Sequence, residues 1–313
     1  ESFLSMHDFK PYFYILTKHR KRAEKIKAAS FKDSSFTNFL DEKMTKVTLN
    51  LPADVPKTKR LFLEENIACY EADIRFPYRF LIDHDIRGSL DLDGHYETGE
   101  HIDRVYKNPD FEPTDFFPKL KVLSFDIETD KDAGDLYSIS LYDGSYKNVL
   151  LVKKKGKFKN AECFPSEKEV LERFQELVLE LDPDVIVGWN VIDFDLDYLK
   201  KKFKEHKVPF LFGRVPWPCK LRISESFFRD SSADFPGRMV LDGIHLMKTS
   251  FIKLDDYKLN TAAKHILGDT KIFQGAGRHD EITEAYNKDP QKLVDYNLKD
   301  SILAYDVIFK SGS

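Results

Sequence analysis

Two carboxylates one residue apart are the clearest chemical feature of the sequence. Asp126 and Glu128 close the mostly apolar run 120–129. A short apolar run predicts a buried strand, and side chains alternate along a strand, so both carboxylates project from one face while Phe125 and Ile127 point into the core. Paired carboxylates repel each other unless a cation lies between them, and Mg²⁺ prefers oxygen ligands. The pair therefore indicates a divalent metal site, although an isolated Asp-x-Glu is also typical of a solvated strand end.

A second group of polar residues follows a later strand. Residues 185–187 (Val-Ile-Val) predict a buried strand, and Asn190, Phe194 and Asp195 come shortly after it. Because ligand sites of open α/β sheets lie at strand ends, we expect Asn190 and Asp195 to converge with the first two carboxylates. The aromatic ring of Phe194 suits stacking on a nucleobase. Two simpler interpretations stay open at this point: Asp195 as a helix cap and Phe194 as a core residue.

A third group lies near the end of the chain. Asp289-Pro290 predicts a helix start, with a capping aspartate followed by proline at the first helical position. Tyr296 and Asp300 are four residues apart and therefore share one face of this helix. A tyrosine one turn from a carboxylate can hold an attacking water while the carboxylate binds a metal. A buried tyrosine hydroxyl bonded to a nearby aspartate is the alternative.

The elements that must position these groups follow from periodicity and turn signals. Strand patterns at 136–141 and 147–152 flank Asp143-Gly144, a hairpin signal. Ser166 and Glu169 form a capping box at the start of an amphipathic helix. Three strands, a helix, a strand and further helices predict an α/β fold, a mixed sheet flanked by helices. Farther on, residues 220–242 predict two strands around a turn at 231–234.

The first third of the chain has a different pattern. Strands are predicted at 7–16, 47–51 and 68–74, and helices at 20–27 and 56–65. We therefore predict a small α+β domain at 1–114, followed by a second domain at 115–310. The boundary is placed at 110–115, where proline and turn-forming residues gather.

Composition limits the class of protein. With 313 residues, 42% hydrophobic and 33% charged, the chain is expected to be a soluble protein of two domains. A net charge of −4 implies that any nucleic-acid contact is local. Three cysteines fit neither a zinc nor a disulfide pattern, and no membrane span or signal peptide is evident, so we expect a cytoplasmic protein. The chain begins without methionine and ends in Ser-Gly-Ser, which favours a piece of a longer protein.

Taken in order, D-x-E, N-x-x-x-F-D and Y-x-x-x-D resemble the three motifs of the 3′–5′ proofreading exonucleases, which share a ribonuclease H-like fold. The wider sequence is similar to family B DNA polymerases. Residues 183–190 and 296–300 resemble the bacterial DNA polymerase II branch, and residues 9–12 and 70–75 resemble the N-terminal domain of the family. The palm signatures S-L-Y-P-S and D-T-D do not occur. The resemblance therefore implies an exonuclease without polymerase activity of its own.

The resemblance also implies a role for each site residue. Two divalent ions, Mg²⁺ or Mn²⁺, would clamp the scissile phosphate. Asp126 would bridge both ions, Glu128 and Asp300 would complete one metal site, and Asp195 would serve the other. Tyr296 would orient the attacking water. The nucleotide would be bound by Thr129, Asn190 and the ring of Phe194, with Lys271 as the candidate for a lysine that assists at the active site.

The implied substrate is the 3′ end of single-stranded primer DNA. The implied partners in the full-length chain are the polymerase palm, fingers and thumb and a sliding clamp, with no membrane. In relatives, a hairpin in the region of 220–242 separates primer from template, although an ordinary sheet hairpin is an equal alternative. Two other functions remain open: a non-catalytic nucleic-acid-binding module of the polymerase, and a free-standing ribonuclease. The presence of all four carboxylates and the tyrosine argues against an inactivated site.

Overall fold

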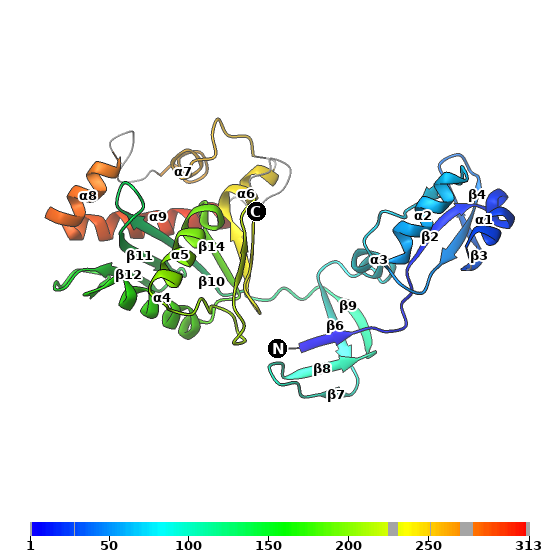
Figure 1. Cartoon of the computed structure of the whole chain (residues 1–313), viewed down its shortest axis with the longest axis horizontal. Coiled ribbons are helices and arrows are strands. Elements are labelled where there is room, and N and C mark those ends of the chain that lie inside the picture. The colour runs from blue at the N-terminus through cyan, green and yellow to red at the C-terminus, as the bar shows by residue number, and fades with distance from the viewer. Residues whose placement is uncertain (1, 28, 225–230, 251, 270–277, 311–313) are drawn as a thin grey trace. The chain divides into compact units, whose positions relative to one another are not determined.

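The structure is a computed structural model that describes residues 2–27, 29–224, 231–250, 252–269 and 278–310. The chain forms two compact units, Glu1–Pro118 and Lys119–Ser313, both drawn in Figure 1. In the described residues, no helix is long and apolar enough to cross a membrane.

The first unit contains a four-stranded sheet in the order β3-β4-β2-β5. Its elements are β2 (Tyr12–Leu16), β3 (Ser30–Thr37), β4 (Lys43–Thr48), β5 (Cys69–Tyr70), the 3-10 turn η1 (Thr17–His19), α1 (Arg20–Ile26) and α2 (Asp54–Glu64). Phe13 and Val47 of the sheet share a core with Phe62 of α2. The two predicted helices and the first two predicted strands are therefore confirmed, with shifted ends, but the strand predicted at 68–74 is only two residues long.

Short strands complete this unit. A three-stranded sheet has the order β1-β8-β7, and β6 pairs with β9. The bounds are β1 (Ser2–Ser5), α3 (Phe76–Asp83), β6 (Ser89–Asp93), β7 (Tyr96–Glu97), β8 (Arg104–Lys107) and β9 (Asp110–Thr114). The sequence did not predict these elements, because most residues of the strands are exposed and lack a strong alternation of apolar and polar side chains.

The second unit is built on a six-stranded sheet in the order β13-β12-β11-β10-β14-β17. Its strands are β10 (Val122–Thr129), β11 (Leu136–Tyr142), β12 (Lys147–Val152), β13 (Ala161–Phe164), β14 (Val185–Gly188) and β17 (Met239–Asp242). The first three strands are antiparallel, whereas β13, β14 and β17 each lie parallel to a neighbour. This is the predicted mixed sheet, and the Asp143-Gly144 signal lies in the turn between β11 and β12.

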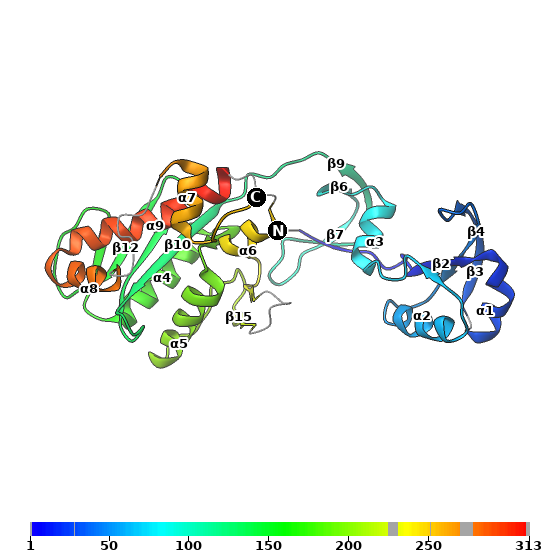
Figure 2. The same ribbon diagram turned by 90° about the horizontal axis from the view of Figure 1, so that it is seen from above.

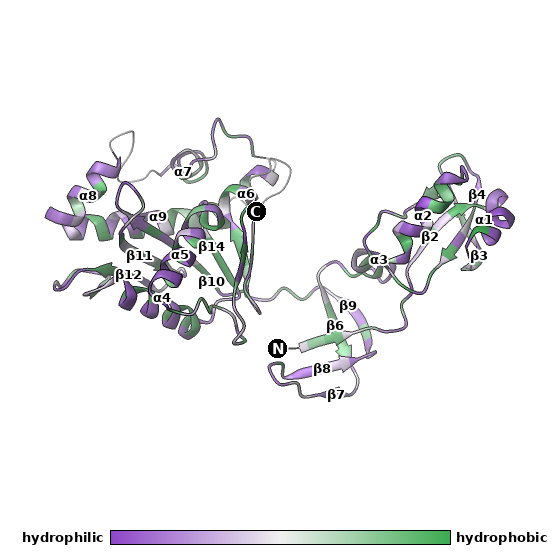
Figure 3. Cartoon of the chain, in the orientation of Figure 1, coloured by the Kyte–Doolittle hydropathy of each residue, from purple (hydrophilic) through white to green (hydrophobic). Residues whose placement is uncertain are grey.

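Helices cover both faces of this sheet. On one face α4 (Glu167–Leu181) and α5 (Asp197–Glu205) pack in a core with Phe125 and Ile127 of β10. On the other face α9 (Pro290–Lys310) contacts β10, β11, β12 and β14. Figures 1 and 2 show α9 along one side of the sheet and α4 along the other. In Figure 3, β14 is hydrophobic, as expected for a strand covered on both faces.

Two predicted helix starts are confirmed. Ser166 caps α4, accepting a hydrogen bond from the Glu169 backbone N–H at 3.4 Å. Asp289 accepts a hydrogen bond from the Lys292 backbone N–H at 3.2 Å, directly before Pro290 opens α9. Three further helices belong to this unit: α6 (Gly243–Thr249), α7 (Leu259–Leu267) and α8 (Arg278–Lys288).

The prediction for residues 220–242 is wrong in its details. β15 (Lys220–Arg222) pairs antiparallel with β16 (Ser232–Asp234), so the predicted turn at 231–234 is mostly strand. The second predicted strand, β17, does not pair with β15 but joins the main sheet beside β14. Part of the connection between β15 and β16 lies outside the described residues. The apolar residues of β17 signalled a strand correctly, but only tertiary packing chose its partner.

Candidate active site

Strand β10 presents its two carboxylates to the face of the sheet that carries α9. Phe125 and Ile127 belong to the opposite core, so Asp126 and Glu128 alternate away from it as predicted. The strand is tied to α9 by Ser124, whose hydroxyl donates to the Ser301 carbonyl at 2.9 Å. A rigid strand packed against a long helix therefore holds both carboxylates.

Three carboxylates from β10 and α9 converge. Asp126, Glu128 and Asp300 each offer an oxygen, and these atoms all lie within 4.8 Å of one another. Glu128 and Asp300 are buried, with 8% and 1% of their surface exposed. Carboxylates gathered at this spacing repel one another without a cation. A donor set made only of carboxylate oxygens fits Mg²⁺ or Mn²⁺, so these residues suit the divalent metal that the sequence predicts.

Asp195 lies beside this cluster on a separate element. It sits in the π-helical turn η2 (Val191–Leu196), and its carboxylate accepts a hydrogen bond from the Ile127 backbone N–H at 3.1 Å. Burial raises the pKa of Asp195 well above its usual value, and the negative charges of Asp126 and Asp242 act in the same direction. The helix-cap interpretation is wrong, because α5 begins after Leu196 and has no side-chain cap. Asp195 instead bonds to the strand that carries the first carboxylates.

Asp242, which the sequence analysis did not single out, holds the segment with Asn190 and Asp195 in place. It lies at the end of β17 and is 2% exposed. Its carboxylate accepts hydrogen bonds from the backbone N–H groups of Asn190 at 3.2 Å, Ile192 at 3.0 Å and Ile244 at 2.9 Å. The last of these caps α6. Asn190 itself has a left-handed backbone (φ 64°), a conformation that asparagine tolerates better than most residues.

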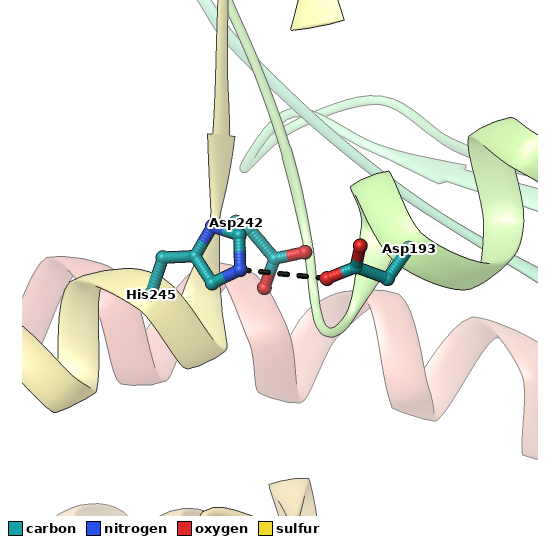
Figure 4. Close-up of side chains that lie close together, drawn as sticks. All are labelled: Asp193, Asp242 and His245. Atoms are coloured by element: carbon teal, nitrogen blue, oxygen red, sulfur yellow. Dashed lines mark ion pairs between the residues drawn. The ribbon is translucent and has the colours of Figure 1, made fainter. Parts of the chain in front are cut away.

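A second group of possible metal ligands surrounds Asp242. Figure 4 shows the His245 ring close to Asp242 and to Asp193. The ligand atoms of all three lie within 4.8 Å of one another, and His245 Nε2 is 3.5 Å from Asp193 Oδ2. Because the Asp242 carboxylate already accepts three backbone N–H groups, capping and an ion pair account for this arrangement. We assign no metal to it.

Tyr296 and Asp300 share the inner face of α9, as their spacing predicts. Both are 1% exposed. Burial raises the pKa of Tyr296 strongly, and the nearby negative charges of Glu128 and Asp300 raise it further, whereas the positive charge of Arg278 acts in the opposite direction. The phenol therefore stays protonated at any physiological pH.

Asn297 is a residue of this site that the sequence analysis missed. It is completely buried, and its side-chain amide donates to Asp126 Oδ2 at 2.8 Å. The side-chain oxygen Oδ1 of Asn297 accepts a hydrogen bond from the Ser138 hydroxyl at 2.8 Å. The available signal was a pair of serines, Ser138 and Ser140, on one face of an otherwise apolar strand. Polar residues in such positions indicate a buried polar contact.

One cavity of about 1160 Å³ brings the predicted side chains together. Its lining includes every predicted site residue that the structure describes: Asp126, Glu128, Thr129, Asn190, Phe194, Asp195, Tyr296 and Asp300. Lys271 lies outside the described residues. Phe194 is 43% exposed, so the core-residue interpretation is wrong. The lining also contains basic and polar residues that were not predicted: Lys248, Lys258, Asn260, Thr261, Arg278 and His279.

Comparison with known proteins identifies the family of the chain. Residues 67–141 and 135–262 match the family described as DNA polymerase family B, exonuclease domain. DNA polymerase II of Escherichia coli (strain K12) is 31% identical over 257 residues, covering 79% of this chain and 32% of that polymerase. The DNA polymerase of Thermococcus litoralis is 28% identical over 323 residues, covering 96% of this chain and 17% of that protein.

A solved structure shares the fold. The family B DNA polymerase of the hyperthermophilic archaeon Pyrobaculum calidifontis has a TM-score of 0.66 and 21% identity, covering 98% of this chain and 41% of that one. The chain thus spans less than half the length of each of these relatives. The family match covers more than half of the chain. This chain therefore belongs to the family B DNA polymerases and contains their exonuclease domain.

Proposed function

We propose that the chain is a 3′–5′ exonuclease that removes nucleotides from the 3′ end of single-stranded or mispaired DNA. The observation that carries the proposal is the convergence of Asp126, Glu128 and Asp300 in the cavity that Tyr296 also lines. Membership of a family with an exonuclease domain supports the same reaction.

In this proposal the carboxylates hold two divalent ions. Asp126 would hold both ions, Glu128 and Asp300 would complete the binding of one, and Asp195 would help to hold the other. When bound, two such ions neutralise charge on the scissile phosphate and activate the attacking water. The raised pKa of Asp195 agrees with this role, because a buried carboxylate beside another carboxylate ionises easily only when a cation compensates the charge.

The remaining side chains position the substrate. The protonated Tyr296 hydroxyl accepts or donates a hydrogen bond and so orients the attacking water. Thr129 and Asn190 hold the terminal nucleotide, and the exposed ring of Phe194 stacks on its base. Lys271 keeps its proposed role as an assisting lysine on the strength of the sequence alone.

We place this activity within a longer polymerase. Residues 115–310 form the ribonuclease H-like exonuclease domain and residues 1–114 the N-terminal domain of a polymerase II-like enzyme. The palm, fingers and thumb of the full-length chain carry out polymerisation, and a sliding clamp contacts that part.

The test is digestion of a single-stranded oligonucleotide labelled at its 5′ end. With Mg²⁺ or Mn²⁺ the chain should produce a ladder of products shortened from the 3′ end, and chelation of the metal should stop it. Asp126→Ala should be inactive, whereas Asp295→Ala should be active, because Asp295 is exposed on the same helix as Tyr296.

An oligonucleotide that is bound but never shortened would refute the exonuclease. It would support the alternative of a non-catalytic nucleic-acid-binding module. A chain that shortened RNA far faster than DNA would instead support the ribonuclease alternative.

A further inference from the structure

Cationic side chains line the same cavity as the carboxylates. Among the described residues that line it, the basic ones are Lys248, Lys258, Arg278 and His279. Lys248, Lys258 and His279 are exposed, and Lys258 lies 3.3 Å from the Asp256 carboxylate. Arg278 differs from these three because its side chain is partly buried.

Helix α8 directs Arg278 toward α9, the helix that carries Tyr296 and Asp300. Arg278 is the first residue of α8, and Ile282 follows four residues later on the same face of the helix. Ile282 is 1% exposed and packs in the core cluster that contains Tyr296. Arg278 and Tyr296 line the same cavity, and the positive charge of Arg278 favours a lower pKa for Tyr296.

Within the residues that the structure describes, the guanidinium of Arg278 has no carboxylate partner. No hydrogen bond or ion pair joins it to another residue in the described part of the chain, although carboxylates line the same cavity. A partly buried charge without a partner costs free energy, and an anion in the cavity would remove that cost. The planar guanidinium presents two parallel N–H donors, a geometry that matches the oxygens of a phosphate.

We propose that Arg278 is a substrate-binding residue that holds a non-bridging phosphate oxygen of the DNA strand at its 3′ end. The inference rests on the proposed exonuclease function and adds to it the side chain that opposes the negative charge of the substrate. In this arrangement the DNA strand lies between two groups of side chains. The carboxylates of β10 and α9 are on one side of it, and the Arg278 guanidinium of α8 is on the other.

Equilibrium binding tests this role without hydrolysis. The probe is a fluorescein-labelled single-stranded oligonucleotide, measured by anisotropy at several salt concentrations with Ca²⁺ in place of Mg²⁺. Arg278→Ala should weaken binding about tenfold and should lower the slope of log K against log salt by about 0.7, the value for one phosphate contact on a single strand. Arg278→Lys should keep most of the slope and lose less affinity than Arg278→Ala. Lysine retains the positive charge but lacks the paired N–H donors of the planar guanidinium.

The matched control is Lys288→Ala at the other end of α8. Lys288 is exposed and lies 3.0 Å from Glu284, so its removal should change neither affinity nor slope. Thermal unfolding of each variant shows whether it is folded. If folded Arg278→Ala bound with the affinity and salt slope of the unmodified chain, the assignment would be wrong. If the unmodified chain bound DNA through Arg278 but never shortened it, the exonuclease proposal would fail while the phosphate contact stood.

Discussion

The side-chain amide of Asn297 donates a 2.8 Å hydrogen bond to Oδ2 of Asp126. The same amide nitrogen lies 3.2 Å from the Asp126 backbone carbonyl, and the Ser138 hydroxyl holds the other end of the Asn297 side chain. A group held at both ends has one rotamer. Asn297 therefore fixes the Asp126 carboxylate and leaves Oδ1 directed away from this contact.

Replacing Asn297 should weaken metal binding more than it weakens the fold. Asn297→Leu removes the donor to Asp126 at nearly constant volume, so the carboxylate loses this positioning hydrogen bond. Loss of such a supporting hydrogen bond typically lowers metal affinity about 10- to 100-fold. Mn²⁺ titration followed by electron paramagnetic resonance measures the affinity. Asn287→Leu, which changes an exposed asparagine of α8, should bind Mn²⁺ like the unmodified chain; equal affinities for both variants would exclude the positioning role.

Tyr296→Phe should slow hydrolysis without abolishing it. The change removes a hydroxyl that orients water and leaves every carboxylate in place. The expected loss in rate is about 10- to 1000-fold, the range for one positioning group. Single-turnover digestion of a labelled oligonucleotide gives the rate, with Asp126→Ala as the inactive reference. If Tyr296→Phe were as inactive as Asp126→Ala, the hydroxyl would have a larger role than orienting the water.

Gly188 allows β10 and β14 to approach closely at the site. A Cβ added there would lie 2.8 Å from the Phe125 carbonyl oxygen and 2.8 Å from Val191 Cβ. Gly188→Ala should therefore lower the free energy of unfolding by about 1–3 kcal/mol, the usual cost of overpacking. Chemical denaturation measures it. Gly88→Ala is the control, since a Cβ at Gly88 has nothing within 4 Å; equal stability of the two variants would contradict the close approach.

Glu167 should make the stability of this unit depend on pH in acid. Burial raises the pKa of Glu167, but hydrogen bonds from the Leu136 backbone N–H, Lys202 and His206 outweigh burial, so the pKa lies below its usual value. A carboxyl with a lower pKa in the folded state stabilises the fold above the unfolded pKa, near 4.5, and loses that contribution as pH falls through the folded value.

The variant Glu167→Gln tests this dependence. At pH 7 it should unfold more easily than the unmodified chain by about 1–3 kcal/mol, and the difference should shrink as the pH falls below the unfolded pKa of 4.5. Denaturation across a pH series supplies the curve. Glu205→Gln should show a small effect at every pH, because Glu205 is exposed and lies 3.6 Å from Lys202. A constant difference between Glu167→Gln and the unmodified chain would rule out the ionised carboxylate as its cause.

The sequence by itself determined the local elements that carry the carboxylates. Alternation along β10 separates Asp126 and Glu128 from the core, and the Asp289 cap starts the helix that places Tyr296 one turn before Asp300. These features depend on residues close together in the chain, so the periodicity of side chains along strands and helices, together with helix capping, is enough to predict them. The roles of these residues in hydrolysis remain predictions.

Tertiary structure alone decided the contacts between distant segments. Asn297 and Asp126 are 171 positions apart, and Asp242 lies 52 positions from the Asn190 backbone that it binds. Local periodicity shows that such residues are polar or buried but not which partner each meets. The partner of β17 was misjudged for the same reason: strand propensity is local, whereas pairing is set by the packing of the whole sheet.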